Sequence, residues 1–174
     1  EAEDRLFVKN SDVLPKPFFV STFKEKIQKL RADPDHREGT EAPRDADLRG
    51  LHILVAEDNE INAEILTEVL KIEGASCEIA ENGQLVLERF ASAAEGEFDA
   101  ILMDVQMPVM NGYDATRAIR ALERKDAATI PIIAMTANAF AEDEKSALDA
   151  GMNAHVAKPI NMELLKKVIR QYVN

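Results

Sequence analysis

The chain has 174 residues, of which 46% are hydrophobic, so it can hold one ordinary domain and a shorter additional segment. Its formal net charge of −11 argues against a nucleic-acid-binding protein, because phosphates would be repelled and no basic run offsets the acidic residues. The single cysteine, Cys77, excludes an internal disulfide and fits a reducing compartment.

No apolar run is long enough to span a bilayer, which takes about 20 residues, and no signal peptide is visible. We therefore expect no direct membrane contact by this part of the protein, and a cytoplasmic location. Because the sequence opens on Glu1 rather than Met, we expect it to be a piece of a longer protein, which a segment elsewhere could anchor to a membrane.

The N-terminal residues resemble the C-terminal ones. Lys16-Pro17 is followed by apolar residues at helical spacing, as Lys158-Pro159 is near the other end of the chain. We interpret residues 1–32 as the end of an upstream module of the same kind as the domain that follows; the alternative is a chance repetition of Lys-Pro before a helix. Residues 33–49 are rich in Pro and charge without periodicity, which is typical of a linker.

From residue 50 to 174, strand-like and helical patterns alternate. The expected strands are residues 52–56, 76–80, 100–103, 130–134 and 154–156, and the expected helices are 60–73, 82–94, 113–124, 139–150 and 162–173. Helix-capping residues stand near several of these boundaries: Asn59, Asn82, Asn161, Gly74 and Gly151. This alternation predicts an α/β domain with right-handed crossovers and a three-layer parallel sheet covered by helices on both faces.

Polar residues follow the strands at the edge where ligands bind in such sheets. The apolar run 100–103 ends at Asp104, and Pro108 keeps the next residues from continuing the strand. Glu57 and Asp58 follow the first strand, Thr136 the fourth, and Lys158 and Pro159 the fifth. Each has an ordinary explanation as a cap, a turn residue or a solvated charge, but their convergence on one edge predicts a site.

Three carboxylates at this edge would repel one another, at about 4 kcal/mol per pair for a 4 Å separation and an effective dielectric constant near 20. Lys158 supplies one compensating charge, and a hard divalent cation is the natural second. Mg²⁺ suits oxygen ligands, whereas His36, His52 and His155 lack the spacing of a zinc site.

Three motifs together resemble the receiver domain of two-component response regulators over residues 51–173, most closely the C-terminal receiver of a hybrid sensor histidine kinase. All three come after the acidic pair Glu57-Asp58 in the chain. In order, they are Met-Asp-Val-Gln-Met-Pro-Val-Met-Asn-Gly around Asp104, Ala-Met-Thr-Ala around Thr136, and Ala-Lys-Pro-Ile around Lys158. The resemblance implies a flavodoxin-like fold whose five parallel strands have the order 2-1-3-4-5.

The resemblance also implies a role for each site residue. Asp104 would be the phosphoacceptor that attacks a phosphohistidine, and the carboxylates of Glu57, Asp58 and Asp104, with the backbone carbonyl of Gln106, would hold Mg²⁺. Lys158 would stabilise charge on the phosphoryl oxygens.

Further positions would support and report this chemistry. Thr136 would donate its hydroxyl to the phosphoryl group, and His155 stands at the position of an aromatic switch residue. Gly112 and Pro159 would be structural, with a cis Lys158–Pro159 bond. Glu57 stands where many members have Asp.

As function, we expect a phosphorelay switch rather than a turnover enzyme. Its partners would be a histidine kinase dimerisation domain and a His-containing phosphotransfer protein, docking on residues 61–70 and the loop after Lys158. Met107 and Met110 would lie where a kinase docks, while Met103 would be a core residue. Because the sequence shows no helix-turn-helix or catalytic domain after the last expected helix, we expect a phosphorelay role rather than a stand-alone transcription factor; the alternative is a partner domain elsewhere in a longer protein.

Three other functions deserve comparison. A phosphatase of the haloacid-dehalogenase type needs a second Asp where the chain has Gln106, and an FMN carrier needs a hydroxyl-rich loop where residues 56–60 are acidic. An inert, receiver-like interaction scaffold remains the third, and it is disfavoured because every expected pocket position carries competent chemistry.

Overall fold

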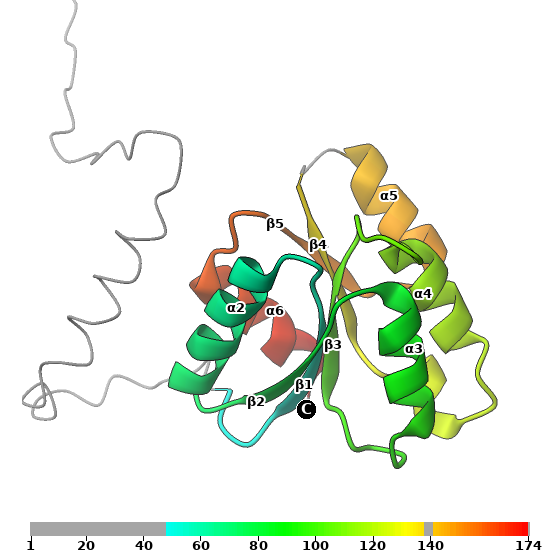
Figure 1. Ribbon diagram of the computed structural model, residues 1–174, viewed down its shortest axis with the longest axis horizontal. Helices are drawn as coiled ribbons and strands as arrows, with labels where there is room; N and C mark the ends of the chain where they lie inside the picture. Colours follow the sequence, from blue (N-terminus) through cyan, green and yellow to red (C-terminus); the bar gives the residue numbers. More distant parts are fainter. Residues whose placement is uncertain (1–47, 138–140, 174) are drawn as a thin grey trace, which may run out of the picture. The chain divides into compact units, whose positions relative to one another are not determined.

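The computed structural model describes residues 48–137 and 141–173, drawn as a coloured ribbon in Figure 1. The expected upstream remnant (residues 1–32) and nearly all of the linker lie outside these residues. The strands are β1 (His52–Ala56), β2 (Ser76–Ala80), β3 (Ala100–Asp104), β4 (Ile132–Thr136) and β5 (Ala154–Ala157). The helices are α2 (Glu60–Ile72), α3 (Gly83–Ser92), α4 (Gly112–Arg120), α5 (Ala141–Ala150) and α6 (Met162–Tyr172), with a 3₁₀ turn η1 (Lys125–Ala128).

The five strands form one parallel sheet in the order β2-β1-β3-β4-β5, which confirms the expected fold class and strand order. Helices α3, α4 and α5 cover one face, and α2 and α6 cover the other (Figure 1). Alternate residues of β1 therefore enter two different cores: Leu54 packs with Phe90 of α3, while Ile53 packs with Leu70 of α2. Burial on both faces explains why β3 and β4 read as unbroken apolar runs.

Asparagine side chains start four of the helices. Asn59, Asn82 and Asn161 accept hydrogen bonds from first-turn amides of α2, α3 and α6, as the sequence predicts. Asn111 does the same for α4, which begins one residue before the expected start at residue 113. The chain therefore enters α4 at Gly112, immediately after the loop that follows β3.

Three strands end later than predicted, among them β5, which ends at Ala157 rather than at residue 156. β3 extends through Asp104, and β4 runs from Ile132 to Thr136 rather than over residues 130–134, so Asp104 and Thr136 are the last residues of their strands. Pro131 has no amide hydrogen to contribute to the ladder, and the pairings Asp104↔Met135 and Thr136↔Ala157 prolong the sheet at its other edge. Because the backbones of Asp104 and Thr136 belong to the sheet, the positions of their Cα atoms are fixed by strand pairing.

Helix α4 ends at Arg120, earlier than predicted, and the side chain of Arg120 forms hydrogen bonds to the segments that follow α4 and α5. The Arg120 guanidinium donates to Gly151 O at 3.0 Å, to Ala127 O at 2.7 Å and to Asn153 Oδ1 at 2.9 Å. Asn153 Oδ1 also accepts from the first amide of β4, that of Ile132. One half-buried cation thus joins α4, η1 and the turn between α5 and β5.

No described helix has both the length and the apolar character needed to cross a membrane.

We predict that Arg120→Met will lower the free energy of unfolding by about 2–4 kcal/mol, because it keeps the aliphatic stem but removes the guanidinium hydrogen bonds to three partly buried oxygens, of which only Asn153 Oδ1 keeps another donor among the described residues. Urea unfolding followed by circular dichroism measures the loss. The matched control is Arg117→Met on the same helix, where an exposed ion pair with Asp114 is removed and the change should stay within about 0.5 kcal/mol. Equal losses in the two variants would contradict the anchoring role of Arg120.

Candidate functional site

The residues predicted to form a site lie where β1, β3, β4 and β5 end. Glu57 follows β1, and its amide donates to Ala80 O at 3.0 Å, which extends the alignment of β1 with β2 by one residue. Lys158 follows β5, and its amide donates to Thr136 O at 2.7 Å. The Lys158–Pro159 peptide bond is cis. Short backbone links to neighbouring strands therefore position both side chains.

The ammonium of Lys158 lies between two buried carboxylates. Its Nζ donates to Glu57 Oε2 at 2.6 Å and to Asp104 Oδ2 at 2.5 Å. The side chains of Glu57 and Asp104 are only 1% and 8% exposed, so water can do little to solvate their charges. Such carboxylates need paired charge and hydrogen bonds to stay ionised.

Two asparagines hold the other oxygen of Glu57. Its Oε1 accepts from Asn62 Nδ2 at 3.0 Å and from the amide of Asn59 at 3.3 Å. The first turn of α2 thus orients a carboxylate that precedes the helix. Sequence reasoning missed Asn62, because nothing in its spacing distinguishes it from an ordinary exposed polar residue of a first turn.

A third carboxylate, that of Asp58, completes an all-oxygen cluster. One oxygen each from Glu57, Asp58 and Asp104 lies within 4.8 Å of the others. Opposite ligands of a small octahedral cation are separated by about 4.2 Å, since each lies about 2.1 Å from the ion. Asp58 is exposed, whereas its two partners are buried. The cluster therefore has the donor type and the spacing for a hard cation that is open to solvent on one side.

Burial and pairing shift the titration of the central pair. Burial raises the pKa of Asp104, outweighing the hydrogen bond and charge of Lys158, which lower it. Burial alone would lower the pKa of Lys158, but its hydrogen bonds to Asp104 and Glu57 raise it. Lys158 is consequently a permanent cation at neutral pH.

The loop between β3 and α4 (residues 105–111) packs directly on the backbone of Asp104. The amide of Gln106 donates to Asp104 Oδ1 at 3.1 Å, and the amide of Gly112 donates to Val105 O at 3.0 Å. A Cβ on Gly112 would lie 2.3 Å from Asp104 O, so only glycine permits this approach. The β3–α4 loop and the start of α4 are therefore built around Asp104.

This loop also contains a strained turn. The amide of Met110 donates to Pro108 O at 2.7 Å across Val109, whose φ is +67°, which is the geometry of a γ-turn. A β-branched residue in this left-handed region costs about 1–3 kcal/mol and persists only where the surroundings hold it. The Val109 side chain is 85% exposed.

The other predicted residues lie on the same edge of the sheet or in the core. Thr136 is buried at the end of β4, and His155 is half-buried on β5, opposite Ala134. Met103 is fully buried, as predicted for a core residue. Met107 and Met110 are half-buried and pack against the core formed by α3 and α4.

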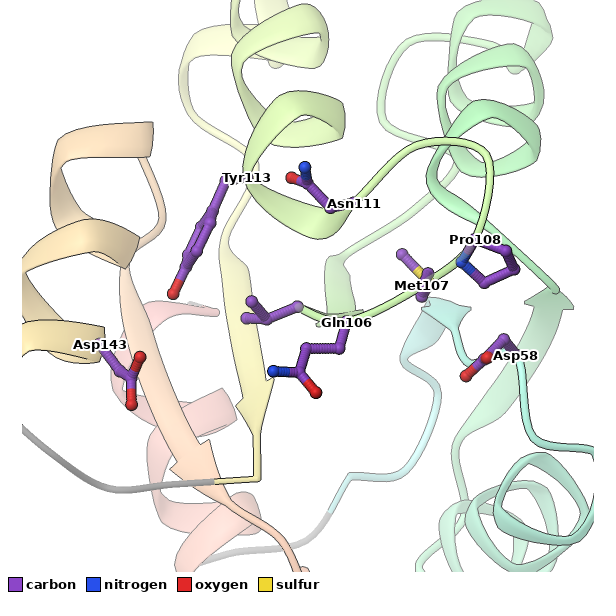
Figure 2. A pocket seen from close by; sticks show the side chains of 8 residues that line it. Asp58, Gln106, Met107, Pro108, Asn111, Tyr113 and Asp143 are labelled. Carbon is purple, nitrogen blue, oxygen red and sulfur yellow. The ribbon is translucent and has the colours of Figure 1, made fainter.

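A groove of about 450 Å³ opens beside this cluster. Asp58 and Pro108 lie on one side, and Tyr113 of α4 and Asp143 of α5 lie on the other, with Gln106 between them (Figure 2). Burial, followed by the nearby charge of Asp143, raises the pKa of Tyr113. Of the three clustered carboxylates, that of Asp58 lines this groove.

Comparison with known proteins identifies this arrangement. Residues 53–170 match the family model described as the response regulator receiver domain. Hybrid signal transduction histidine kinase I of Dictyostelium discoideum is 39% identical over 123 residues, which are 70% of this chain and 7% of that protein. Probable histidine kinase 1 of Oryza sativa subsp. indica is 33% identical over 150 residues, covering 70% of this chain and 15% of that protein. The chain thus spans a small part of these curated relatives.

Solved structures agree. The receiver domain of the sensor histidine kinase PA1611 from Pseudomonas aeruginosa, solved with a magnesium ion coordinated in its active site cleft, is 36% identical; the match has a TM-score of 0.64 and covers 71% of this chain and 97% of that one. A chain from the co-crystal structure of the Saccharomyces cerevisiae phosphotransfer protein Ypd1 with the receiver domain of Ssk1 is 34% identical, with a TM-score of 0.64 over 71% of this chain and 88% of that one. The chain therefore belongs to the response regulator receiver domain family.

Proposed function

We propose that this domain takes a phosphoryl group from a phosphohistidine onto Asp104 and works as a switch in a phosphorelay. The observation that carries the proposal is the Lys158 ammonium, 2.5 Å from Asp104 Oδ2 in a pocket that excludes most water. A carboxylate oxygen of Asp104 attacks phosphorus in line, the bond from phosphorus to the imidazole nitrogen breaks, and its electron pair returns to the imidazole. Lys158 stabilises the negative charge that gathers on the phosphoryl oxygens.

Mg²⁺ is the cation that the oxygen cluster would hold, through the carboxylates of Asp58 and Asp104 and the backbone carbonyl of Gln106. It supplies further charge stabilisation to the phosphoryl oxygens. Both oxygens of Glu57 already accept hydrogen bonds, which supports contact of Glu57 with the ion through water. The magnesium in the related Pseudomonas receiver is consistent with this assignment.

Thr136 and His155 would convert phosphorylation into a change of shape. Thr136 lies at the end of β4, paired with Ala157 one residue before Lys158, so its hydroxyl starts close to the phosphorylation site. Movement of Thr136 toward the phosphoryl oxygens would free space that the ring of His155 can enter. His155 is half-buried on the adjacent strand, which permits such a rotation.

The partners we propose are a histidine kinase dimerisation domain and a His-containing phosphotransfer protein. Ile61 of α2 and Leu164 of α6 are 48% and 50% exposed and flank the site, which suits a docking face. The relatives named as hybrid histidine kinases, and the Ypd1–Ssk1 complex, support this choice. In the same proposal the longer protein is a hybrid kinase, residues 1–32 end an upstream receiver-like module, and residues 33–49 link it to the domain at 50–174.

Phosphorylation of Asp104 has a direct test. Incubated with acetyl phosphate and Mg²⁺, the protein should gain one phosphoryl group by intact mass spectrometry, and hydroxylamine should remove it, because an acyl phosphate is labile to this nucleophile. Asp104→Asn should gain none, since an amide is a much weaker nucleophile.

The control for this experiment is Asp149→Asn, an exposed carboxylate on α5, which should be phosphorylated like the unaltered protein. An equal adduct on Asp104→Asn would exclude Asp104 as the acceptor. No adduct on the unaltered protein would favour the interaction scaffold.

Binding of Mg²⁺ should stabilise the domain, by about 2.7 kcal/mol at a Mg²⁺ concentration 100 times its dissociation constant. Asp58→Asn should raise stability in the presence of a chelator, because one repelling carboxylate is gone, and should lose most of the gain from Mg²⁺. Urea unfolding with Mg²⁺ or EDTA measures both effects, with Asp149→Asn as the control. If Asp58→Asn and Asp149→Asn responded equally to Mg²⁺, the proposed metal site would be wrong.

A further inference from the structure

Helix α3 contacts the loop that follows Asp104, although no residue of α3 takes part in the proposed chemistry. Its first residue, Gly83, donates its amide hydrogen to Met110 O at 3.0 Å. Asn82, the residue before it, caps α3 by accepting a hydrogen bond from the amide of Leu85 at Oδ1, at 3.0 Å. The start of α3 is thus bonded to the β3–α4 loop.

Gly83 has no room for a side chain. A Cβ at this position would lie 2.5 Å from Met110 O, 2.8 Å from the Cβ of Ala115 and 3.1 Å from Asn111 O. Two of these three atoms are backbone oxygens of the loop. Because the backbone of Gly83 is not left-handed, any residue could adopt its conformation, and close approach is what requires glycine here.

The loop needs such external support. Its γ-turn at Val109 is strained, and the 85% exposed side chain of Val109 contributes little packing to hold it. Met110 is bonded on both sides: its amide closes the turn onto Pro108, and its carbonyl accepts from Gly83. Two residues further on, Gly112 packs against Asp104 O, so a displacement of Met110 is passed to the backbone of Asp104 over a very short stretch of chain.

We propose that Gly83 is a positioning residue for phosphoryl transfer, which holds the strained β3–α4 loop so that Asp104 and the Gln106 carbonyl face the incoming phosphoryl group and the cation. This inference rests on the proposed phosphorylation of Asp104. In Gly83→Ala the new methyl group pushes Met110 O away, and the loop takes a different course beside Asp104.

The experiment measures the rate constant for phosphorylation by acetyl phosphate at a fixed, saturating Mg²⁺ concentration, together with the urea unfolding midpoint. Gly83→Ala should slow phosphorylation about 10- to 100-fold, because misplacement by about 1 Å has effects of this size. Phe90→Leu, a buried residue of the same helix, is the control for lost stability. It should lower the unfolding midpoint but leave the rate within about twofold, since Phe90 lies about two helical turns along α3 from Gly83.

Rescue by a second substitution separates positioning from packing. Val109→Gly relaxes the turn, because glycine adopts a positive φ without strain, and lets the loop re-form around a displaced Met110 carbonyl. The double variant Gly83→Ala/Val109→Gly should therefore recover about tenfold in rate over Gly83→Ala. A coupling of this kind is expected of residues that act through one shared backbone segment.

The outcomes are distinct. A Gly83→Ala rate equal to that of Phe90→Leu at matched stability, or a double variant no faster than Gly83→Ala, overturns the inference. If Gly83→Ala does not fold, the double variant decides: recovery of folding and rate supports positioning, whereas an unfolded double variant assigns Gly83 to packing alone and overturns it. Failure of the unaltered protein to be phosphorylated overturns the proposed function itself, a result separate from these.

Discussion

The site depends on one ammonium group between two buried carboxylates. Lys158 compensates part of the charge of Glu57 and Asp104, which would otherwise take up protons in a pocket with little water. Compensation is incomplete, because Asp58 adds a third carboxylate within 4.8 Å. The remaining negative charge is unfavourable for the isolated domain and favourable for binding a cation. The domain thus carries a local destabilisation of the kind expected where function and stability conflict.

The parallel sheet makes this arrangement possible. Lys158 is 101 residues from Glu57 and 54 residues from Asp104 in the chain, yet one Nζ reaches both. Parallel pairing aligns the ends of β1, β3, β4 and β5, and two separate cores hold the sheet from both faces. The backbone that carries each side chain of the site is therefore fixed by the sheet. Binding of a phosphoryl group then requires little further ordering of the chain.

The β3–α4 loop adds a second constraint. Two close approaches that exclude a Cβ, at Gly83 and Gly112, surround a turn that is strained at Val109. Rigid helices on either side can maintain this strain, whereas a loop with only its own contacts would relax. In the proposed role, Gly83 helps to determine the position of Asp104. Gly83 belongs to α3, a helix that contributes no side chain to the site.

The fold class, the order of elements, the helix caps at Asn59, Asn82 and Asn161, and the sheet edge at which polar residues gather could all be predicted from the amino-acid sequence. These follow from periodicity and local chemistry, which act over a few residues and can be read in one dimension. The ends of β3 and β4 were predicted too early, because pairing across the sheet, rather than local propensity, extends them to Asp104 and Thr136.

The contacts between distant side chains could not be predicted in the same way. Several hydrogen bonds join segments whose spacing in the chain does not indicate that they are in contact. They run from Asn62 to Glu57, from Gly83 to Met110 O, and from Arg120 to its three acceptors. The burial that raises the pKa of Asp104 is likewise set by the surrounding layers. Contacts of this kind depend on distances between packed elements, and local sequence patterns do not encode those distances.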